Sequence, residues 1–279
     1  MHYTRITSER ELIEGLGEPS AVILCGGTDL LVRMRSGLST PEILLDISNL
    51  EPLQGIRETE GSVVIGAATT ESELLASPLV RDRLPLLASA LAVLGSVQIR
   101  NRGTLGGNLV NASPAADSAI PLLAYDAQLV LASASGERTV AVAEFLVGPG
   151  KTALNDAEFV RAVRVPLPPP DHRTFYHKVG KRRALTIAIA SVGVVASISE
   201  DRITDIRIAA GSVAPTPLRL HEVERLLVGR ALSEGTIAES GRLAANAVSP
   251  IDDIRATAAY RREVVGDLVA RALRGFAAR

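Results

Sequence analysis

Two turns built on adjacent glycines carry the residue types that bind phosphate. The first runs Cys25-Gly26-Gly27-Thr28-Asp29 and the second runs Thr104-Leu105-Gly106-Gly107-Asn108. Glycine has no Cβ, so backbone N–H groups can approach anionic oxygens closely, and Thr and Asn add side-chain hydrogen-bonding groups. Each turn alone is also typical of a capped strand-to-helix turn, with Thr28 or Asp29 as the cap of the first. Together the two turns favour a diphosphate site.

An acidic residue follows the second turn. Asp117 ends the segment Ser113-Pro114-Ala115-Ala116-Asp117, and its carboxylate can accept a hydrogen bond from a hydroxyl or from a ring N–H. The sequence shows no nucleophile-base pair, no paired acid and base, and no G-x-G-x-x-G dinucleotide fingerprint. We therefore predict that a cofactor carries out the chemistry, that no residue of this chain is catalytic, and that the protein holds and tunes the cofactor.

The composition excludes several classes of protein. The 279 residues are 47% hydrophobic and 22% charged, with a net charge of -1, so we expect no nucleic-acid partner. Cys25 is the single cysteine, which leaves no ligand set for zinc or an iron-sulfur cluster, and we predict no metal site. No apolar run reaches the roughly 20 residues of a membrane span, and the first residues are not a signal segment. We expect a cytoplasmic protein.

A strand-helix-strand unit is predicted to position the first turn. Ser8 and Glu11 have the spacing of a capping box, which predicts a helix to Leu16. The apolar runs 21–24 and 43–47 predict buried strands with the glycine turn and a helix between them. In such a unit the turn leaves the carboxyl end of the first strand, where backbone N–H groups are free to meet a ligand.

Mixed strand and helix surround the second turn, and a separate region follows. We predict a strand at 63–66, a helix from 85 to 95 and a hairpin around 135–137. The proline-rich segment 166–171 cannot continue a helix or a ladder, so we place a domain boundary there. Beyond it, alternating apolar residues predict a hairpin, and three helical segments close the chain, the last with an apolar stripe. That stripe is Val264, Leu268, Ala272 and Phe276.

Five motifs in a fixed order resemble a known family. Over nearly its whole length the chain resembles the FAD-binding medium subunit of molybdenum hydroxylases, the group that contains xanthine dehydrogenase and carbon monoxide dehydrogenase. The motifs are Gly26-Gly27-Thr28-Asp29-Leu30, Ile65-Gly66-Ala67-Ala68-Thr69-Thr70, Gln98 to Asn108, Ser113-Pro114-Ala115-Ala116-Asp117, and a closing motif from Asp253 to Arg262.

The resemblance implies the fold and the site. The fold class is α+β: a two-subdomain FAD-binding fold of the PCMH type over residues 1–170, divided at about 55/56, then a smaller α+β domain over 171–279 with an antiparallel sheet and a three-helix bundle. FAD is expected to bind noncovalently between the two glycine turns. The cofactor-binding residues carried over are Ile23, Leu24, Cys25, Gly26, Gly27, Thr28, Asp29, Leu30, Leu94, Thr104, Leu105, Gly106, Gly107, Asn108, Asp117, Val160 and Lys178.

The resemblance also implies partners. Electrons are expected to pass from a small subunit with two 2Fe-2S clusters to the FAD and on to NAD, quinone or oxygen, while a large subunit carries the molybdopterin cofactor. Thr186 stands where the family commonly has Asp, which leaves any role of that acid in doubt. We interpret Asp253 and the residues around Arg261 as a helix cap with surface ion pairs. Two alternatives are a self-standing flavin-dependent oxidoreductase and a non-flavin assembly scaffold.

Overall fold

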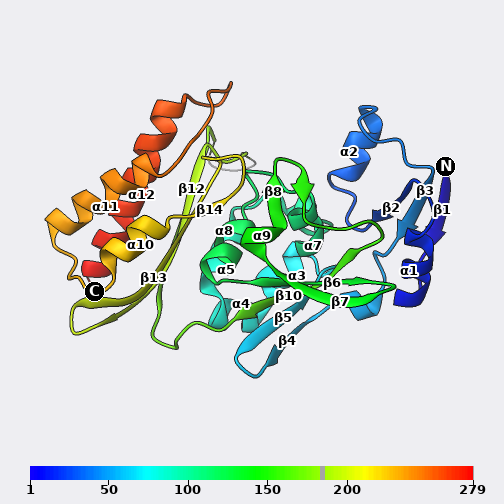
Figure 1. The fold of residues 1–279 in the computed structure, drawn as a ribbon, viewed down its shortest axis with the longest axis horizontal. Helices are drawn as coiled ribbons and strands as arrows, with labels where there is room; N and C mark the ends of the chain where they lie inside the picture. The colour runs from blue at the N-terminus through cyan, green and yellow to red at the C-terminus, as the bar shows by residue number, and fades with distance from the viewer. Residues whose placement is uncertain (183–185, 279) are drawn as a thin grey trace.

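The computed structural model describes residues 1–182 and 186–278. The three larger sheets of the described residues follow one another along the long axis (Figure 1): a three-stranded sheet near the N-terminus, a five-stranded sheet in the middle and a four-stranded sheet near the C-terminus. Strands β8 and β9 form a fourth, two-stranded sheet. Within the described residues, no helix combines the length and the apolar character that a membrane crossing requires. The arrangement is mixed helix and sheet, so the predicted α+β fold class is confirmed.

The N-terminal sheet is parallel, with strand order β1-β3-β2. Ser8 accepts a hydrogen bond from the Glu11 N–H and caps α1 as predicted, whereas the Glu11 carboxylate accepts from the N–H of Thr7 instead of closing the box on Ser8. The short edge strand β1 was not predicted, because its sequence is polar and all four residues are exposed. The elements are β1 (His2–Arg5), α1 (Glu9–Leu16), β2 (Ala21–Leu24), α2 (Leu30–Arg35) and β3 (Ile43–Asp46).

The middle unit is built on an antiparallel sheet of order β4-β5-β10-β6-β7. Helix α5 ends at Ala92, with its C-cap at Val93, so it is shorter than the helix predicted to run to Gly95. The elements are η1 (Glu51–Leu53), β4 (Ile56–Thr59), β5 (Ser62–Gly66), α3 (Glu71–Ala76), α4 (Pro78–Arg83), α5 (Pro85–Ala92), α6 (Val97–Arg100), α7 (Leu105–Val110), α8 (Ala119–Ala124), β6 (Gln128–Ser133), β7 (Gly136–Ala141), α9 (Val142–Phe145), β8 (Leu146–Gly148), β9 (Lys151–Thr152) and β10 (Phe159–Pro166).

The C-terminal unit is an antiparallel sheet of order β11-β12-β13-β14 with helices on one face. The predicted stripe on the last helix, Val264 to Phe276, is buried against this sheet. The elements are β11 (Arg173–Val179), β12 (Ala190–Ser199), β13 (Arg202–Gly211), β14 (Leu218–Arg219), α10 (His221–Leu227), α11 (Glu234–Asn246) and α12 (Ala258–Ala277).

The other face of the C-terminal sheet packs on the middle unit through α8. Ile120 of α8 is fully buried over Gly193 and Gly211, and a Cβ at these glycines would lie 2.8 Å and 2.6 Å from the Ile120 side chain. Burying a side chain of this size contributes about 1.5–3 kcal/mol. The two units therefore share one packed interface, and loops from both can reach a common site.

Candidate functional site

Both glycine turns line one cavity of about 870 Å³. This volume lies within the range of about 300–1,000 Å³ that is typical of small-molecule sites. The wall is completed by loops from the middle unit and by the segment at Thr186 and Ile187 that leads into the C-terminal sheet. The predicted residues that line the cavity are Ile23, Cys25, Gly27, Thr28, Asp29, Leu30, Leu94, Thr104, Gly106, Gly107, Asn108, Asp117 and Val160.

Four predicted site residues, Leu24, Gly26, Leu105 and Lys178, do not line the cavity among the described residues. Leu105 is fully buried in the core of the middle unit. Gly26 lies where the first turn meets the second: a Cβ there would stand 2.1 Å from the carbonyl oxygen of Arg102. The absence of a side chain at Gly26 therefore permits the two turns to touch, which is a packing role.

The first turn presents backbone donors to the cavity. Gly27 has a φ of 71°, a left-handed conformation that glycine adopts at little cost. Within the described residues, the N–H groups from Gly27 to Leu30 donate no hydrogen bond to the protein, and Asp29 makes no side-chain cap bond to α2. The turn therefore keeps several donors available for an anionic ligand.

The second turn is held by the segment that follows β5. The N–H groups of Leu105 and Gly106 donate to the carbonyls of Thr69 (3.1 Å) and Ala67 (2.9 Å). Thr104 caps α7, because its Oγ1 accepts from the Gly107 N–H at 3.2 Å. These backbone donors are used by the fold. The turn thus offers a surface free of side chains, along with the Thr104 hydroxyl and the side-chain N–H groups of Asn108, whose Oδ1 already accepts from the Ser118 hydroxyl at 2.7 Å.

Asp117 lies in a buried group of polar side chains at the cavity wall. The Lys178 ammonium on β11 donates to Asp117 Oδ2 at 2.5 Å and to the Val93 carbonyl at 3.1 Å, while the Tyr176 hydroxyl donates to Asp117 Oδ1 at 3.0 Å. Burial raises the pKa of Asp117, and the ammonium of Lys178 limits that rise. Lys178 therefore acts on the cavity through Asp117, from behind the wall.

Glu71 is a cavity residue that the sequence did not reveal. It is 1% exposed, and its Oε2 has no hydrogen-bond partner among the described residues. Burial, followed by repulsion from Asp117, raises the pKa of Glu71 to about 7. An acid in the first turn of a helix is ordinarily a favourable charge at a helix N-terminus, so its residue type and position carried no signal of this burial.

The closing motif is structural and Asp253 pairs with Arg255, as we interpreted it, but the cap residue and the surface position of Arg261 were wrong. Thr257 caps α12, and Arg261 is 1% exposed rather than at the surface. Its guanidinium donates to the carbonyls of Ile189 (2.7 Å) and Ser212 (2.9 Å) and to Asp253 Oδ1 (2.6 Å). The Ser212 N–H in turn donates to the Pro114 carbonyl at 2.8 Å. Arg261 therefore braces the loop that carries Asp117.

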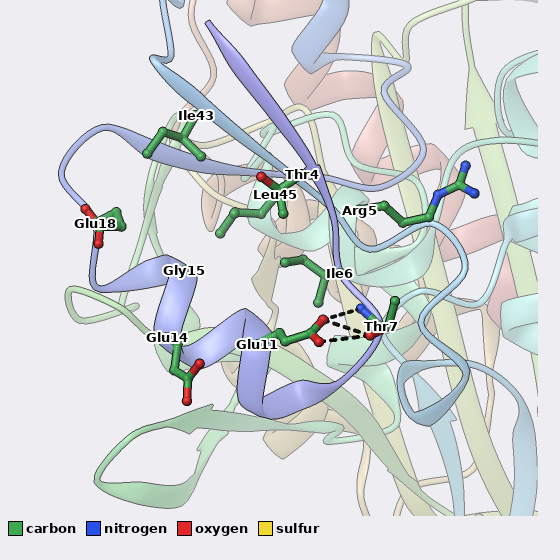
Figure 2. Close-up of a pocket in the computed structure, with 10 residues that line it drawn as sticks. All are labelled: Thr4, Arg5, Ile6, Thr7, Glu11, Glu14, Gly15, Glu18, Ile43 and Leu45. Atoms are coloured by element: carbon green, nitrogen blue, oxygen red, sulfur yellow. Dashed lines mark hydrogen bonds between the residues drawn. The ribbon is translucent and has the colours of Figure 1, made fainter.

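A second, smaller cavity of about 440 Å³ lies between β1, β3 and α1 (Figure 2). It has an apolar floor that includes Ile43 and Leu45, and its rim includes Glu14 and Glu18. The Glu11 carboxylate in this cavity is already bound by Thr7. None of the predicted site residues lines it.

Comparisons with known proteins agree with the fold and identify the family. A family described as the FAD binding domain in molybdopterin dehydrogenase matches residues 1–168, and the CO dehydrogenase flavoprotein C-terminal domain matches residues 175–276. The chain is 36% identical to the carbon monoxide dehydrogenase medium chain of Hydrogenophaga pseudoflava, over 98% of this chain and 94% of that one. It is 34% identical to the glyceraldehyde dehydrogenase medium chain of Sulfolobus acidocaldarius, over 98% and 96%.

A solved structure gives the same answer at the level of the fold. Carbon monoxide dehydrogenase from Hydrogenophaga pseudoflava, in a form that lacks the Mo-pyranopterin moiety of the molybdenum cofactor, matches with a TM-score of 0.95 and covers 98% of this chain and 96% of that one. The two matched family domains, on an α+β fold of this arrangement, define an FAD-binding oxidoreductase subunit. The chain belongs to the family of FAD-binding medium subunits of molybdenum hydroxylases, which confirms the resemblance.

Proposed function

We propose that this chain holds FAD noncovalently in the large cavity and passes electrons from the iron-sulfur clusters of a partner subunit to an external acceptor such as NAD, quinone or oxygen. The observation that carries the proposal is the meeting of both glycine turns on one cavity, with the donors of Gly27 to Leu30 directed to no protein acceptor among the described residues. A diphosphate is the part of FAD that needs such donors.

The residues of the chain have distinct roles in this proposal. The N–H groups of the first turn hold the diphosphate, and Gly106 and Gly107 let it approach the second turn. Asp117, held in place by Lys178 and Tyr176, accepts a hydrogen bond from the cofactor. The bound flavin supplies the redox chemistry, because it exchanges electrons singly or in pairs.

Noncovalent binding follows from the residues at the cavity. The sequence has four histidines, and none of them lines the cavity in the described part of the chain. Burial raises the pKa of the Cys25 thiol, which keeps it protonated and a poor nucleophile. Retention of FAD then rests on hydrogen bonds and packing alone.

Partner subunits follow from the cysteine count and from the relatives. One cysteine cannot ligate an iron-sulfur cluster, so a cluster that supplies electrons to the flavin must lie in another chain. The relatives are medium chains of dehydrogenases, and the solved carbon monoxide dehydrogenase is an enzyme with a molybdenum cofactor. We infer a complex with an iron-sulfur small subunit and a molybdopterin large subunit, with the substrate chosen by the large subunit.

A visible spectrum tests the cofactor. The purified chain, or the apo-chain after FAD is added and the excess removed, is expected to show flavin absorption, and denaturation should release all of the flavin. A chain that stays colourless refutes FAD binding and favours the scaffold alternative. Flavin that stays attached to the denatured chain contradicts noncovalent binding.

Co-purification tests the partners. A tagged chain isolated from its native cell is expected to bring down chains that contain iron-sulfur clusters and molybdopterin. A flavin-loaded chain that is isolated without such partners, yet turns over an organic substrate alone, would favour the self-standing oxidoreductase.

A further inference from the structure

Glu71 is the one side chain at the cavity with a buried oxygen that the described part of the chain leaves unpaired. It is the first residue of α3, where the adjacent capping box uses Thr70 and Glu73. Its backbone N–H donates to the Gly103 carbonyl at 2.9 Å, which fixes the start of α3 against the second glycine turn. The carboxyl therefore has a defined position in the wall and is not needed to cap its own helix.

The carboxyl of Glu71 lies against Gly103 in the wall of the cavity. A Cβ at Gly103 would lie 2.9 Å from Glu71 Oε2, so only the missing side chain at Gly103 makes room for this oxygen. An unpaired buried polar atom costs about 1–3 kcal/mol, which is recovered when a ligand supplies the partner. Both residues line the cavity in which we place FAD.

The charged groups around Glu71 favour its neutral form. The carboxylate of Asp117 repels a negative charge on Glu71, and the nearby cation Lys178 is already paired with Asp117. Arg100 on α6 favours the ionised form of Glu71, but its effect on the pKa is smaller than the effects of burial and of Asp117. Helix α5 has no ionisable side chain, and on α4 the charged residues are Arg81 and Asp82, both exposed, and Arg83, which pairs with Glu58. Burial in this setting raises the pKa of Glu71 to about 7.

We propose that Glu71 is a further cofactor-contacting residue, whose protonated carboxyl donates a hydrogen bond to an acceptor oxygen or nitrogen of the bound FAD. The inference rests on the proposed FAD site and adds to it a residue that no motif marked. A protonated carboxyl is a donor, whereas the ionised form is an acceptor only and would repel the acceptor atoms of the cofactor. FAD affinity therefore depends on the proton of Glu71.

The pH dependence of binding follows from this proton. A ligand that binds the protonated form raises the pKa of that group, so its affinity is complete below the pKa of the free protein and falls above it. With a pKa of about 7 in the FAD-free chain, FAD binding is expected to weaken above neutral pH, by up to about tenfold per pH unit. Glutamine keeps an N–H donor of similar shape and cannot ionise.

The test is an FAD titration of the full chain between about pH 6 and about pH 8.5. We compare the wild type with Glu71→Gln, Glu71→Leu and the matched control Glu73→Gln, in which an exposed carboxyl on the same helix is changed. Wild type and control should lose affinity as the pH rises. Glu71→Gln should stay near the low-pH affinity throughout, and Glu71→Leu should bind about tenfold more weakly at the lowest pH.

The outcomes separate this inference from the proposed function. If Glu71→Gln shows the same pH profile as the wild type, or if Glu71→Leu binds as tightly as the wild type at the lowest pH, the contact is refuted while the FAD site stands. If the wild type binds no FAD at any pH, the proposed function itself fails and the contact falls with it. The glutamine variant keeps the comparison valid even if the leucine variant does not fold.

Discussion

A substitution at Gly107 should affect FAD binding with little effect on folding. Gly107 is exposed to the cavity, and the one atom near a Cβ at this position is Thr104 Oγ1, at 2.9 Å. The neighbouring Gly106 is buried, and a Cβ there would lie 2.7 Å from the Ala67 Cβ and 2.8 Å from the Ala67 carbonyl oxygen. Gly107→Val therefore fills the cavity, whereas Gly106→Ala strains the core.

The two substitutions should have different effects on the free energy of unfolding and on FAD affinity. Disturbing the Thr104 cap costs about 0.5–2 kcal/mol, and replacing a helical glycine returns up to about 1 kcal/mol, so Gly107→Val should change the free energy of unfolding by about 1 kcal/mol or less. Its side chain prevents the diphosphate from approaching the second turn. Losing two charge-assisted hydrogen bonds of about 1.5–3 kcal/mol each weakens FAD binding by about 100-fold or more. Gly106→Ala should cost about 1–3 kcal/mol of stability.

Equilibrium titration with FAD and thermal denaturation of the apo-chain measure the two effects separately. We expect Gly107→Val to melt within a few degrees of the wild type, since about 1 kcal/mol corresponds to roughly 2–4 °C in a chain of this size. Gly106→Ala should melt lower. A normally melting Gly107→Val chain that binds FAD with wild-type affinity would refute the placement of the diphosphate over the second turn.

Three further predictions concern charged side chains. Lys178→Met leaves Asp117 buried without its cation, so the free energy of unfolding in urea should fall by about 3–5 kcal/mol, with partial recovery when Asp117→Asn is added; an unchanged unfolding curve would contradict the pairing. Arg261→Met removes the donors to two backbone carbonyls and an aspartate, and stability should fall by roughly 3 kcal/mol together with FAD affinity; wild-type melting and binding would disprove the bracing role. The hydrogen bond from Arg138 lowers the pKa of Glu158 from 4.5 to about 2, so its contribution to stability is present above pH 4.5 and is lost as the pH falls through the lowered value. Thermal melts at stepped pH should show a shallower acid loss in Arg138→Met, and identical pH profiles would exclude the pair as a cause.

The sequence predicted where the first glycine turn of the candidate site lies in the fold. Adjacent glycines after an apolar run mark a turn that exposes N–H groups, and this turn lies at the carboxyl end of β2 as predicted. Side chains that reach the site from outside the two glycine turns were harder to predict. Lys178 matched a family position, but only the pairing of β11 with β12 and the packing of this sheet on α8 place it behind Asp117.

Burial of polar residues was the main gap in prediction. Glu71 and Arg261 both lie in helix first turns, where charged residues are ordinarily exposed, and their burial is decided by segments far away in sequence. For Glu71 that segment contains Gly103, and for Arg261 it is the pair of carbonyls at Ile189 and Ser212. A single sequence carries no local signal for such contacts.

The long sequence distance between Arg261 and the loop that it braces has a consequence for the order in which the protein matures. Arg261 reaches Pro114 through Ser212, so the loop with Asp117 is braced only after residue 261 has been synthesised and α12 has docked. Domains generally fold from the N-terminus during translation, and the glycine turns are then ready first. We therefore expect stable cofactor loading to require a docked α12: chains truncated before α12 should form the middle sheet but fail to retain FAD through gel filtration, and full retention by such a fragment would show that the site matures without its brace.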